Sequence, residues 1–317
     1  MTARQPLISI CIPAYKRIEY LQRLLQSIAD QSHTDFEVIV TDDSPDETVR
    51  ELCHEYQNKF SLFHYRNAQA LGTPENWNQA IRNAKGKWIK LMHDDDWFLD
   101  QNSLRTFADK VQNRPDSYFV FSAYRNVYSG KMAMTKDIFP KPILYKMLLK
   151  NPAILFSGNV IGPPSCVIYK QKEDIWFDRR LKWLVDIDFY IRYLSDTKPV
   201  YIPSILVNIG ISDTQVTKDT FGNRNIEIPE YFLLLTKTGP AVLGNVLVFD
   251  AWWRLMRNMG IRKPQDIREA GHSGEIHRKI LFILKFQSRI PHKLLNSGLA
   301  SKIAMTICFI VSKWKSF

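Results

Sequence analysis

The chain has 317 residues, of which 45% are hydrophobic, and it carries 43 Lys and Arg against 32 Asp and Glu. This length suits one large domain or one domain with an appendage, and the hydrophobic content supports a sizeable core. No apolar run approaches the roughly 20 residues that cross a bilayer, which argues against a membrane-spanning protein. Because a strand pattern starts almost at the first residue, we expect no signal peptide.

The net charge of +11 is concentrated toward the end of the chain. Residues 226–317 hold 14 Lys and Arg but only 6 Asp and Glu, so most of the excess belongs to this segment. Such a segment favours an anionic surface or substrate as its partner. No known nucleic-acid-binding module accompanies it, so we expect no nucleic acid partner.

The cysteines are far apart in the sequence and show no C-x-x-C spacing; they are Cys11, Cys53, Cys166 and Cys308. Neither a disulfide framework nor a zinc site is predicted. Cys11 and Cys166 fall within predicted strands, where a free thiol acts as a small hydrophobic side chain. This cysteine usage fits a reducing cytosol, and we expect a cytoplasmic protein.

Strand and helix patterns alternate through the first part of the chain. Strands are expected at residues 7–12, 36–41, 61–65 and 88–92, and helices at residues 17–31, 46–59 and 76–83. Pro13 is expected to stop the first strand. Such alternation with short turns predicts a parallel, doubly wound sheet with right-handed crossovers. Beyond it, an aromatic strand is expected at residues 117–127, a helix at 140–151 and a strand at 166–169.

The most unusual stretch is the apolar run 88–92, which is followed at once by His93, Asp94, Asp95 and Asp96. Ligand sites in open α/β sheets lie just beyond the carboxyl ends of such strands. Three adjacent carboxylates repel one another and cost stability unless a cation lies between them. Their oxygens are the ligands that Mg²⁺ and Mn²⁺ prefer. The alternative is a solvated acidic turn that caps the next helix.

Several landmarks in chain order resemble the family 2 glycosyltransferases of bacterial surface-polysaccharide type. They are Pro13-Ala14-Tyr15, Asp42-Asp43-Ser44, Leu71-Gly72, Asn76-Trp77-Asn78-Gln79-Ala80 and the acidic cluster at 93–96. The resemblance covers about residues 6–210. It implies an α/β class with a GT-A, Rossmann-like nucleotide-sugar domain, a mixed, mostly parallel sheet and a C-terminal α-helical extension. We expect the first domain at residues 1–225 and the basic helical extension at residues 226–317.

The resemblance also implies residues for the nucleotide-sugar donor. Asp43 matches the family carboxylate that hydrogen-bonds the nucleobase, with Asp42 as its structural neighbour, and Pro13 and Tyr15 would line the same base. Asn76, in the family's helix, is assigned to the same donor site. The alternative for the two aspartates is a strand-end turn with local side-chain bonds. The alternative for the tyrosine is packing at the rim.

The family's metal motif is usually D-x-D followed by another acidic residue, and this chain departs from it by placing His93 where the first aspartate often stands. By resemblance, Asp95 is the direct ligand of Mn²⁺ or Mg²⁺, and Asp96 supports it. Asp94 is assigned to the ribose or to a water-mediated metal contact. We interpret His93 as a spacer or phosphate-side donor, because imidazole is a softer ligand than Mg²⁺ prefers. The metal would offset charge on the leaving diphosphate.

Residues 183–192 resemble the family segment E-D-x-D-x-x-x-R, in which the second acidic residue is the catalytic base. Asp186 takes that position, and Val185 replaces the preceding glutamate. That replacement removes a like charge and adds apolar surface, so its net effect on the pKa of the base stays open. Asp188 and Arg192 stand at i,i+4 and are interpreted as a structural ion pair. The alternative for Asp186 is a helix cap.

The remaining segments concern the acceptor and the tail. Residues 158–165 resemble a family stretch near the acceptor or form a tight loop, and residues 214–217 are interpreted as an acceptor-side or diphosphate-closing loop. Tail helices are expected at residues 227–237, 241–259, 274–287 and 299–315. The apolar segment 303–311 between basic residues suits an interfacial helix on the anionic inner leaflet of a cell membrane. A helix docked on the core is the alternative.

We therefore expect a metal-dependent, inverting glycosyltransferase. It would move a sugar from a nucleotide diphosphate-sugar to a saccharide acceptor in polysaccharide or lipopolysaccharide (O-antigen) biosynthesis. If the tail contacts a membrane, we expect that acceptor to be a lipid-linked saccharide. A polyprenyl-phosphate sugar synthase and a non-catalytic nucleotide-sugar binding module are the alternatives. A nucleotidyltransferase is disfavoured because residues 13–17 contain no glycine for a phosphate loop.

Overall fold

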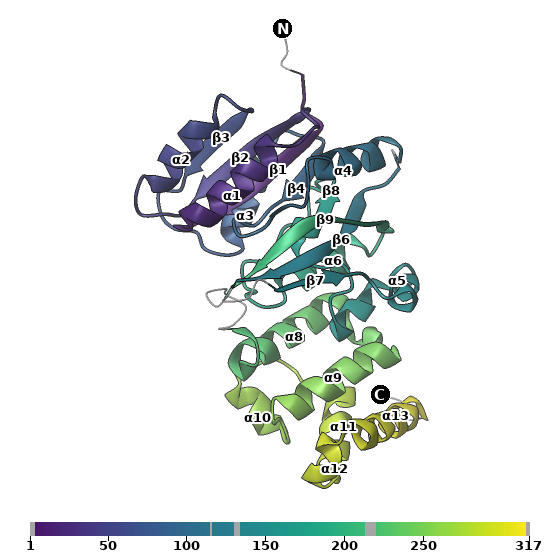
Figure 1. Cartoon of the computed structure of the whole chain (residues 1–317). Coiled ribbons are helices and arrows are strands. Elements are labelled where there is room, and N and C mark those ends of the chain that lie inside the picture. Colours follow the sequence, from purple (N-terminus) through teal and green to yellow (C-terminus); the bar gives the residue numbers. More distant parts are fainter. Residues whose placement is uncertain (1–3, 115, 130–133, 213–219, 315–317) are drawn as a thin grey trace. The chain divides into compact units, whose positions relative to one another are not determined.

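The computed structural model describes residues 4–114, 116–129, 134–212 and 220–314. The chain divides into two compact units, and each is described by itself (Figure 1). The first comprises Met1–Leu149, Val160–Arg180 and Arg192–Gln215, and the second comprises Lys150–Asn159, Leu181–Ile191 and Val216–Phe317. The domain boundary expected after residue 225 stays a prediction. The loop predicted at residues 214–217 lies outside the described residues.

The first unit is built on one mixed sheet. Its strands are β1 (Ile8–Ala14), β2 (Phe36–Asp42), β3 (Leu62–Arg66), β4 (Trp88–Leu91), β5 (Trp97–Phe98), β6 (Phe119–Tyr128), β7 (Met134–Ile138), β8 (Val167–Tyr169) and β9 (Val200–Ile211). Their order is β3-β2-β1-β4-β8-β6-β9-β5, with β7 paired to β6. β1, β2, β3 and β4 are parallel, as are β6 and β9, whereas β8 pairs antiparallel with both β4 and β6. The sheet is therefore mixed, as expected.

Helices connect these strands, and helices are present in the ranges expected at residues 17–31, 46–59, 76–83 and 140–151. They are α1 (Ile18–Ala29), α2 (Thr48–Tyr56), α3 (Glu75–Asn83), α4 (Ser103–Gln112), α5 (Pro142–Leu148) and the short 3-10 helix η2 (Pro164–Cys166). In α1 the buried side chains are Leu21, Leu24, Leu25 and Ile28, the i, i+3, i+4, i+7 pattern of an amphipathic helix. Burial of each such side chain stabilises the fold by about 1.5–3 kcal/mol. The hydrophobic spacing thus positions α1 against the strands.

The predicted stop of the first strand at Pro13 is wrong, because β1 continues to Ala14. The ladder between β1 and β4 ends at the pair Cys11–Leu91, before the proline. The ladder between β1 and β2 continues through Pro13 and Ala14. Since alternate residues of a strand face opposite neighbours, the missing N–H of Pro13 falls on the side where pairing has already ended.

The second unit is helical. Its elements are η1 (Pro152–Ser157), the greater part of α6 (Val185–Tyr193), α8 (Arg224–Thr238), η3 (Pro240–Gly244), α9 (Val246–Asn258), α10 (Pro264–Glu269), α11 (Arg278–Gln287), α12 (His292–Asn296) and α13 (Gly298–Trp314). α9 is its centre, since Phe249, Trp252, Trp253 and Met256 are all buried. None of the described helices is long and apolar enough to cross a membrane.

The tail helices follow the predicted pattern with one correction. The single helix expected over residues 241–259 is wrong at its start, because η3 ends and α9 begins separately at Val246. Asn245 lies between them, and its side chain accepts a hydrogen bond of 2.9 Å from the amide of Leu247. An asparagine in this position is a strong N-cap, which explains why a new helix starts there. The short helices α10 and α12 were not predicted.

Candidate active site

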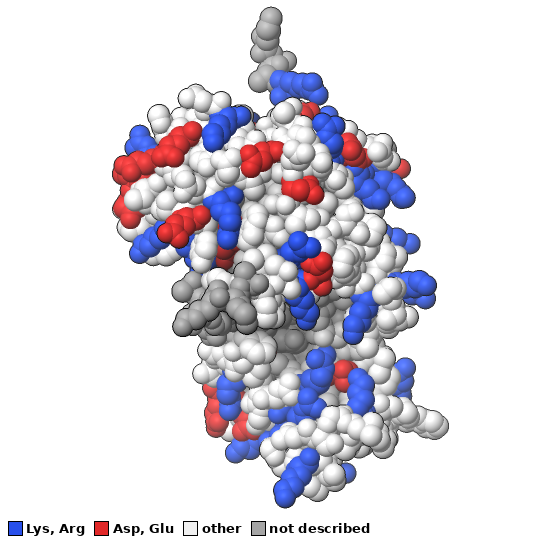
Figure 2. All heavy atoms as spheres, in the orientation of Figure 1, with Lys and Arg blue, Asp and Glu red and all other residues white. Residues whose placement is uncertain are grey.

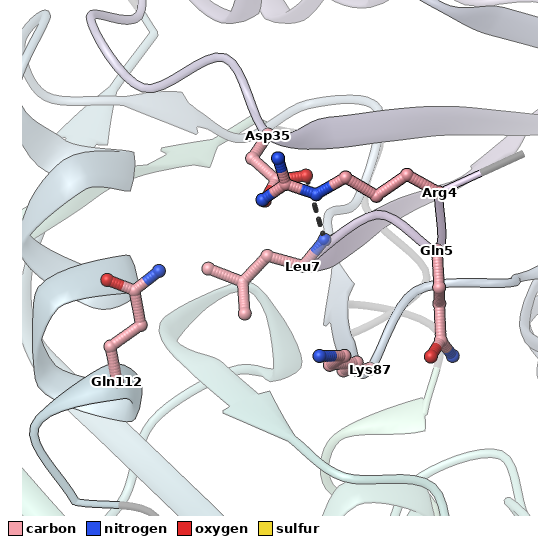
Figure 3. Close-up of a pocket in the computed structure, with 6 residues that line it drawn as sticks. All are labelled: Arg4, Gln5, Leu7, Asp35, Lys87 and Gln112. Carbon is pink, nitrogen blue, oxygen red and sulfur yellow. Dashed lines mark hydrogen bonds and ion pairs between the residues drawn. The ribbon is translucent and has the colours of Figure 1, made fainter.

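The carboxyl ends of β1, β2 and β4 meet at one edge of the sheet, since these strands are parallel neighbours. Tyr15, Asp43 and the cluster 93–96 follow these ends. A pocket at the opposite edge is lined partly by Leu7, Asp35 and Lys87, which directly precede the same three strands (Figure 3). Ligands of open α/β sheets bind at the carboxyl edge. The first edge is therefore the candidate site.

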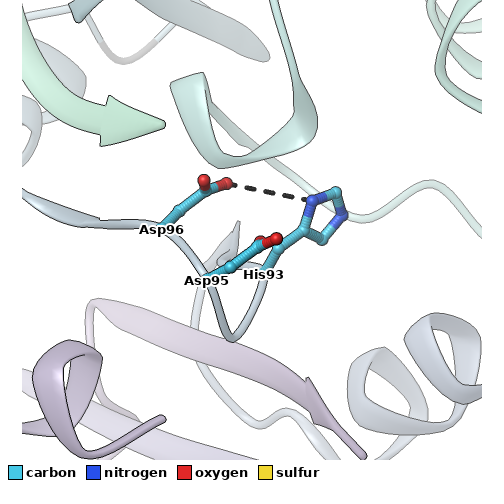
Figure 4. Close-up of side chains that lie close together, drawn as sticks. All are labelled: His93, Asp95 and Asp96. Atoms are coloured by element: carbon cyan, nitrogen blue, oxygen red, sulfur yellow. Dashed lines mark ion pairs between the residues drawn. The ribbon is translucent and has the colours of Figure 1, made fainter. Parts of the chain in front are cut away.

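Three side chains at this edge form a compact group. His93, Asp95 and Asp96 each offer one ligand atom, and these atoms lie within 4.8 Å of one another. Figure 4 shows His93 and Asp96 pointing toward each other, with 3.8 Å between Nδ1 of His93 and the Asp96 carboxylate. Within the described part of the chain, the buried Nε2 of His93 has no hydrogen-bond partner. One imidazole nitrogen and two carboxylates this close together are a donor set that fits a divalent cation.

Electrostatics in the group supports the same conclusion. Burial, and next the charge of Asp95, raise the pKa of Asp94 to about 7 against the opposing effect of Arg17. The same two causes raise the pKa of Asp96 well above its ordinary range. Burial lowers the pKa of His93, so this ring is disfavoured as a cation. A divalent cation beside Asp94 and Asp96 would favour their ionised forms and so oppose the rise in both pKa values.

Two arginines that we did not single out from the sequence hold Asp95. Nη1 of Arg17 lies 3.0 Å from the Asp95 carboxylate and 3.9 Å from that of Asp94. Arg23 donates to the backbone carbonyl of Asp95 at 2.9 Å, and its guanidinium lies 3.6 Å from the ring centre of Trp97. Arg17 stands two residues after the tyrosine of the first motif, at the start of α1. That proximity to the motif was the only sequence signal for it.

Hydrogen bonds to neighbouring elements also fix the cluster 93–96. The amide of Gly210 in β9 donates to Asp96 at 3.1 Å, and the amide of His93 donates to the hydroxyl of Ser165 at 3.0 Å. Lys90 in β4 is fully buried, and its ammonium group donates a hydrogen bond to the backbone carbonyl of Ser165. Burial lowers the pKa of Lys90 to about 7. The acidic turn is therefore a fixed structure rather than a solvated loop.

The tight fit at Gly210 gives a first prediction. A Cβ added there would lie 2.4 Å from the carbonyl oxygen of Asp95, which is backbone and has little freedom to move. We expect Gly210→Ala to lower the free energy of unfolding by about 1–3 kcal/mol, as overpacking does. Urea denaturation measures this. Gly244→Ala is the matched control, since nothing lies within 4 Å of its Cβ position. Equal effects of the two variants would contradict the fit.

The residues predicted for the nucleotide form a network at the end of β2. The Asp43 carboxylate accepts from the amides of Leu71 and Gly72 at 2.9 and 2.8 Å, and from the side chain of Asn67 at 2.8 Å. Asn67 also donates to the side chain of Asn76 at 2.9 Å. Asp43 and Asn76 are thus brought together, and Asp43 shapes the glycine loop.

The other predicted nucleotide residues lie beside this network. Asp42 is fully buried and accepts from the amide of Ser44 at 2.8 Å, while Nε2 of His64 lies 3.1 Å from it. These contacts of Asp42 lie within the protein, as we expected for a structural neighbour of Asp43. Tyr15 is half exposed, and Pro13 is partly buried in register with β2. An exposed aromatic ring at this edge is available to a base.

Asp186, the predicted base, lies in the second unit as the second residue of α6. Its carboxylate accepts from the side chain of Asn159 at 2.7 Å and from the amide of Ile187 at 2.8 Å. Burial raises its pKa to about 6, and these hydrogen bonds only partly oppose that shift. The sequence left open in which direction the pKa of Asp186 is shifted; in the structure burial has the largest effect and raises it. Asp188, the predicted structural residue, is fully buried and pairs with Lys237 at 2.6 Å.

Glu230 of α8 holds the start of the helix that carries Asp186. Its carboxylate accepts from the amides of Lys182, Trp183 and Leu184 at 2.7, 3.0 and 2.8 Å. These donors precede α6, where helix amides lack partners within the helix. The sequence contained no signal for this cap, because its partners are far apart along the chain.

This cap gives a second prediction. We expect Glu230→Gln to speed hydrogen exchange at residues 182–184 and to lower the melting temperature, because hydrogen bonds to a charged group contribute about 1.5–3 kcal/mol. Exchange followed by mass spectrometry measures the local effect. Glu269→Gln is the control, since Glu269 is exposed in α10 of the same unit. Unchanged exchange at residues 182–184 would rule out the capping role.

Comparison with known proteins identifies the family. The sequence matches glycosyl transferase family 2 over residues 9–175, more than half of the chain. An uncharacterized glycosyltransferase of Haemophilus influenzae is 28% identical over 201 residues, which are 62% of this chain and 64% of that protein. The putative teichuronic acid biosynthesis glycosyltransferase TuaG of Bacillus subtilis is 27% identical over 158 residues, or 49% of this chain and 61% of that protein. Each of these two matches spans less than two thirds of the relative's length.

Solved structures share the fold. S. aureus TarS 1–349 in complex with UDP-GlcNAc is 16% identical with a TM-score of 0.56, covering 97% of this chain and 90% of that one. The mannosyltransferase PcManGT from Pyrobaculum calidifontis, in complex with GDP-Man and Mn²⁺, is 14% identical with a TM-score of 0.56, covering 99% of this chain and 87% of that one. The expected GT-A fold is thereby confirmed. The chain belongs to glycosyl transferase family 2, a family of glycosyltransferase enzymes.

Proposed function

We propose that the chain transfers a sugar from a nucleotide diphosphate-sugar to a saccharide acceptor with the help of Mn²⁺ or Mg²⁺. The observation that carries this proposal is the group of His93, Asp95 and Asp96 at the carboxyl edge of the sheet, beside the network of Asp43. The fold supports it, because two of the solved structures that share this fold hold a nucleotide-sugar, and one of these two holds Mn²⁺.

In this proposal Asp95 and Asp96 hold the metal together with His93. When bound there, the metal offsets the negative charge that develops on the leaving diphosphate. Asp94 contacts the ribose or a metal-bound water. His93 is included because its Nδ1 faces the Asp96 carboxylate at 3.8 Å, whereas the sequence alone favoured a spacer or phosphate-side donor.

The donor nucleotide binds beside the metal. Pro13 and Tyr15 line the base, and Asp43 accepts a hydrogen bond from it. A carboxylate has about four lone-pair sites, and three hydrogen bonds from the protein leave Asp43 one of them. Asn76 and Asp42 hold the end of β2 in the geometry that this contact needs.

Asp186 acts as the general base in this proposal. It takes the proton from an acceptor hydroxyl while that oxygen attacks the anomeric carbon, and the bond to the nucleotide diphosphate breaks on the opposite face. A single displacement of this kind inverts the configuration. A pKa of about 6 leaves Asp186 largely ionised at neutral pH yet more basic than an ordinary aspartate. The assignment rests on the family segment and on the surroundings of Asp186 in its own unit.

The acceptor belongs to the surface-polysaccharide class in this proposal. TuaG is named for teichuronic acid biosynthesis, and a comparable role in polysaccharide or lipopolysaccharide (O-antigen) assembly on the cytoplasmic side of the cell membrane fits the chain. A lipid-linked saccharide is the acceptor that such assembly extends.

Calorimetric titration with UDP, GDP and dTDP, each with and without Mn²⁺, tests the donor site. We expect one of the three to bind clearly more tightly than the others, and only when Mn²⁺ is present. Absence of binding by folded protein would overturn the proposal. Binding without turnover on any saccharide acceptor would favour a non-catalytic binding module, and transfer to polyprenyl phosphate would favour the synthase.

A further inference from the structure

One face of α13 is apolar and exposed. The exposed side chains are Leu299, Ile303, Ile307, Ile310, Val311 and Trp314, which we call the apolar face of α13. Their spacing of three or four residues places them on one side of the helix. Trp314 is 86% exposed and Leu299 75%. Leu294 in the preceding α12 is also exposed. Contiguous apolar surface of this kind marks an interaction site.

The opposite face of α13 is packed in the second unit. The rings of Phe309 and Phe249 lie 5.2 Å apart, and the hydroxyl of Ser301 accepts from the indole of Trp253 at 3.0 Å. Met305 and Cys308 are buried on the same side. The two alternatives for this helix are therefore not exclusive: α13 is docked by one face and presents the other.

The segment that contains α13 is strongly basic. The segment 276–317 contains no Asp or Glu and eight Lys and Arg. The cations of its described part are Arg278, Lys279, Lys285, Arg289, Lys293, Lys302 and Lys313. Lys302 lies 3.0 Å from Asp250 of α9. Figure 2 shows that most charged side chains on the displayed face of the C-terminal helices are Lys or Arg.

We propose that the apolar face of α13 lies in the interfacial layer of a bilayer that contains anionic lipids, with Lys and Arg of the segment 276–317 at the headgroups. Exposed aliphatic residues, a tryptophan and cations around them are the composition of an interfacial helix. A second copy of this chain fits less well, because a two-fold contact would bring two segments of the same positive charge together. That this surface brings the enzyme to a lipid-linked acceptor rests on the proposed function, whereas the surface itself does not.

Sedimentation of the full chain with vesicles tests the proposal. We expect binding to vesicles of phosphatidylcholine and phosphatidylglycerol, at least about tenfold weaker binding to phosphatidylcholine alone, and weakening by added salt. The double variant Ile303→Glu and Ile307→Glu should lower binding to the anionic vesicles by at least about tenfold, because it places two carboxylates in the layer. Phe139→Glu is the matched control, since Phe139 is an exposed apolar residue of the first unit.

A second readout follows the helix directly. The emission of Trp314 should shift to shorter wavelength on binding, and Trp314→Phe should remove that shift while circular dichroism shows the fold intact. Equal binding by wild type and the double variant would overturn the proposal. The proposal would also be overturned if the wild type formed a concentration-dependent dimer and the double variant did not, because the apolar face of α13 would then bind a second copy of the chain. The assay contains neither nucleotide nor metal, so its failure leaves the proposed function standing, and the reverse also holds.

Discussion

Asp95→Ala is expected to abolish metal-dependent nucleotide binding. Asp95 is buried and lies in the group of His93 and Asp96. Removal of an outer-shell partner of a metal ligand already costs roughly 10–100-fold in affinity, so loss of a direct ligand should cost more. Calorimetry with Mn²⁺ and the preferred nucleotide measures this loss, and electron paramagnetic resonance counts bound Mn²⁺.

The same variant should not destabilise the fold when metal is absent. The charge of Asp95 is one cause of the raised pKa of Asp94, second to burial, so its removal should bring the pKa of Asp94 down from about 7. Arg17 loses a partner, but its side chain is partly exposed and can be hydrated. Asp109→Ala is the control, since Asp109 is exposed on α4. Metal-dependent binding by Asp95→Ala as tight as in wild type would remove Asp95 from the proposed ligand set.

Most strands and helices of the first unit could be predicted from the sequence because their information is local, whereas β5, β7 and β9 were not predicted. Residues 7–12, 36–41 and 88–92 are apolar runs of strand length between turns, and they became β1, β2 and β4. Leu21 and Ile28 carry the helical period of α1. The end of β1 was missed because the effect of Pro13 depends on which neighbouring strand is still paired at that point.

The supports of the candidate site could not be predicted, because each depends on residues distant in sequence. Gly210 of β9 donates to Asp96, which is 114 residues away in the sequence, and Glu230 caps a helix that starts far before it. Arg17 near Asp95 depends on the way β1 and β4 pair. Motif spacing places functional residues at strand ends, but it does not show which distant donor forms a hydrogen bond with each carboxylate.

Asp186→Asn is expected to lower kcat by about 10²–10⁴-fold, the usual contribution of general acid–base catalysis. Asparagine keeps the shape of the side chain, and its single oxygen can accept from Asn159 or from the amide of Ile187, but it takes up no proton. The KM for the nucleotide-sugar should change little. For wild type, kcat/KM should fall as the pH drops through about 6, because the base is then protonated. This acidic limb should be absent from the residual activity of the variant.

Stability separates this role from helix capping. A carboxyl whose pKa is raised on folding from 3.8 to about 6 favours its neutral form, so its stabilisation is complete below the unfolded pKa and is lost as pH rises through about 6. At pH 8 the wild type therefore bears a buried charge that Asp186→Asn removes, and the variant should unfold at an equal or higher temperature. A mere cap would act in the opposite direction, since loss of its charge at a helix start lowers stability. A variant that is both less stable at pH 8 and fully active would assign Asp186 to the helix and leave the base to be sought elsewhere.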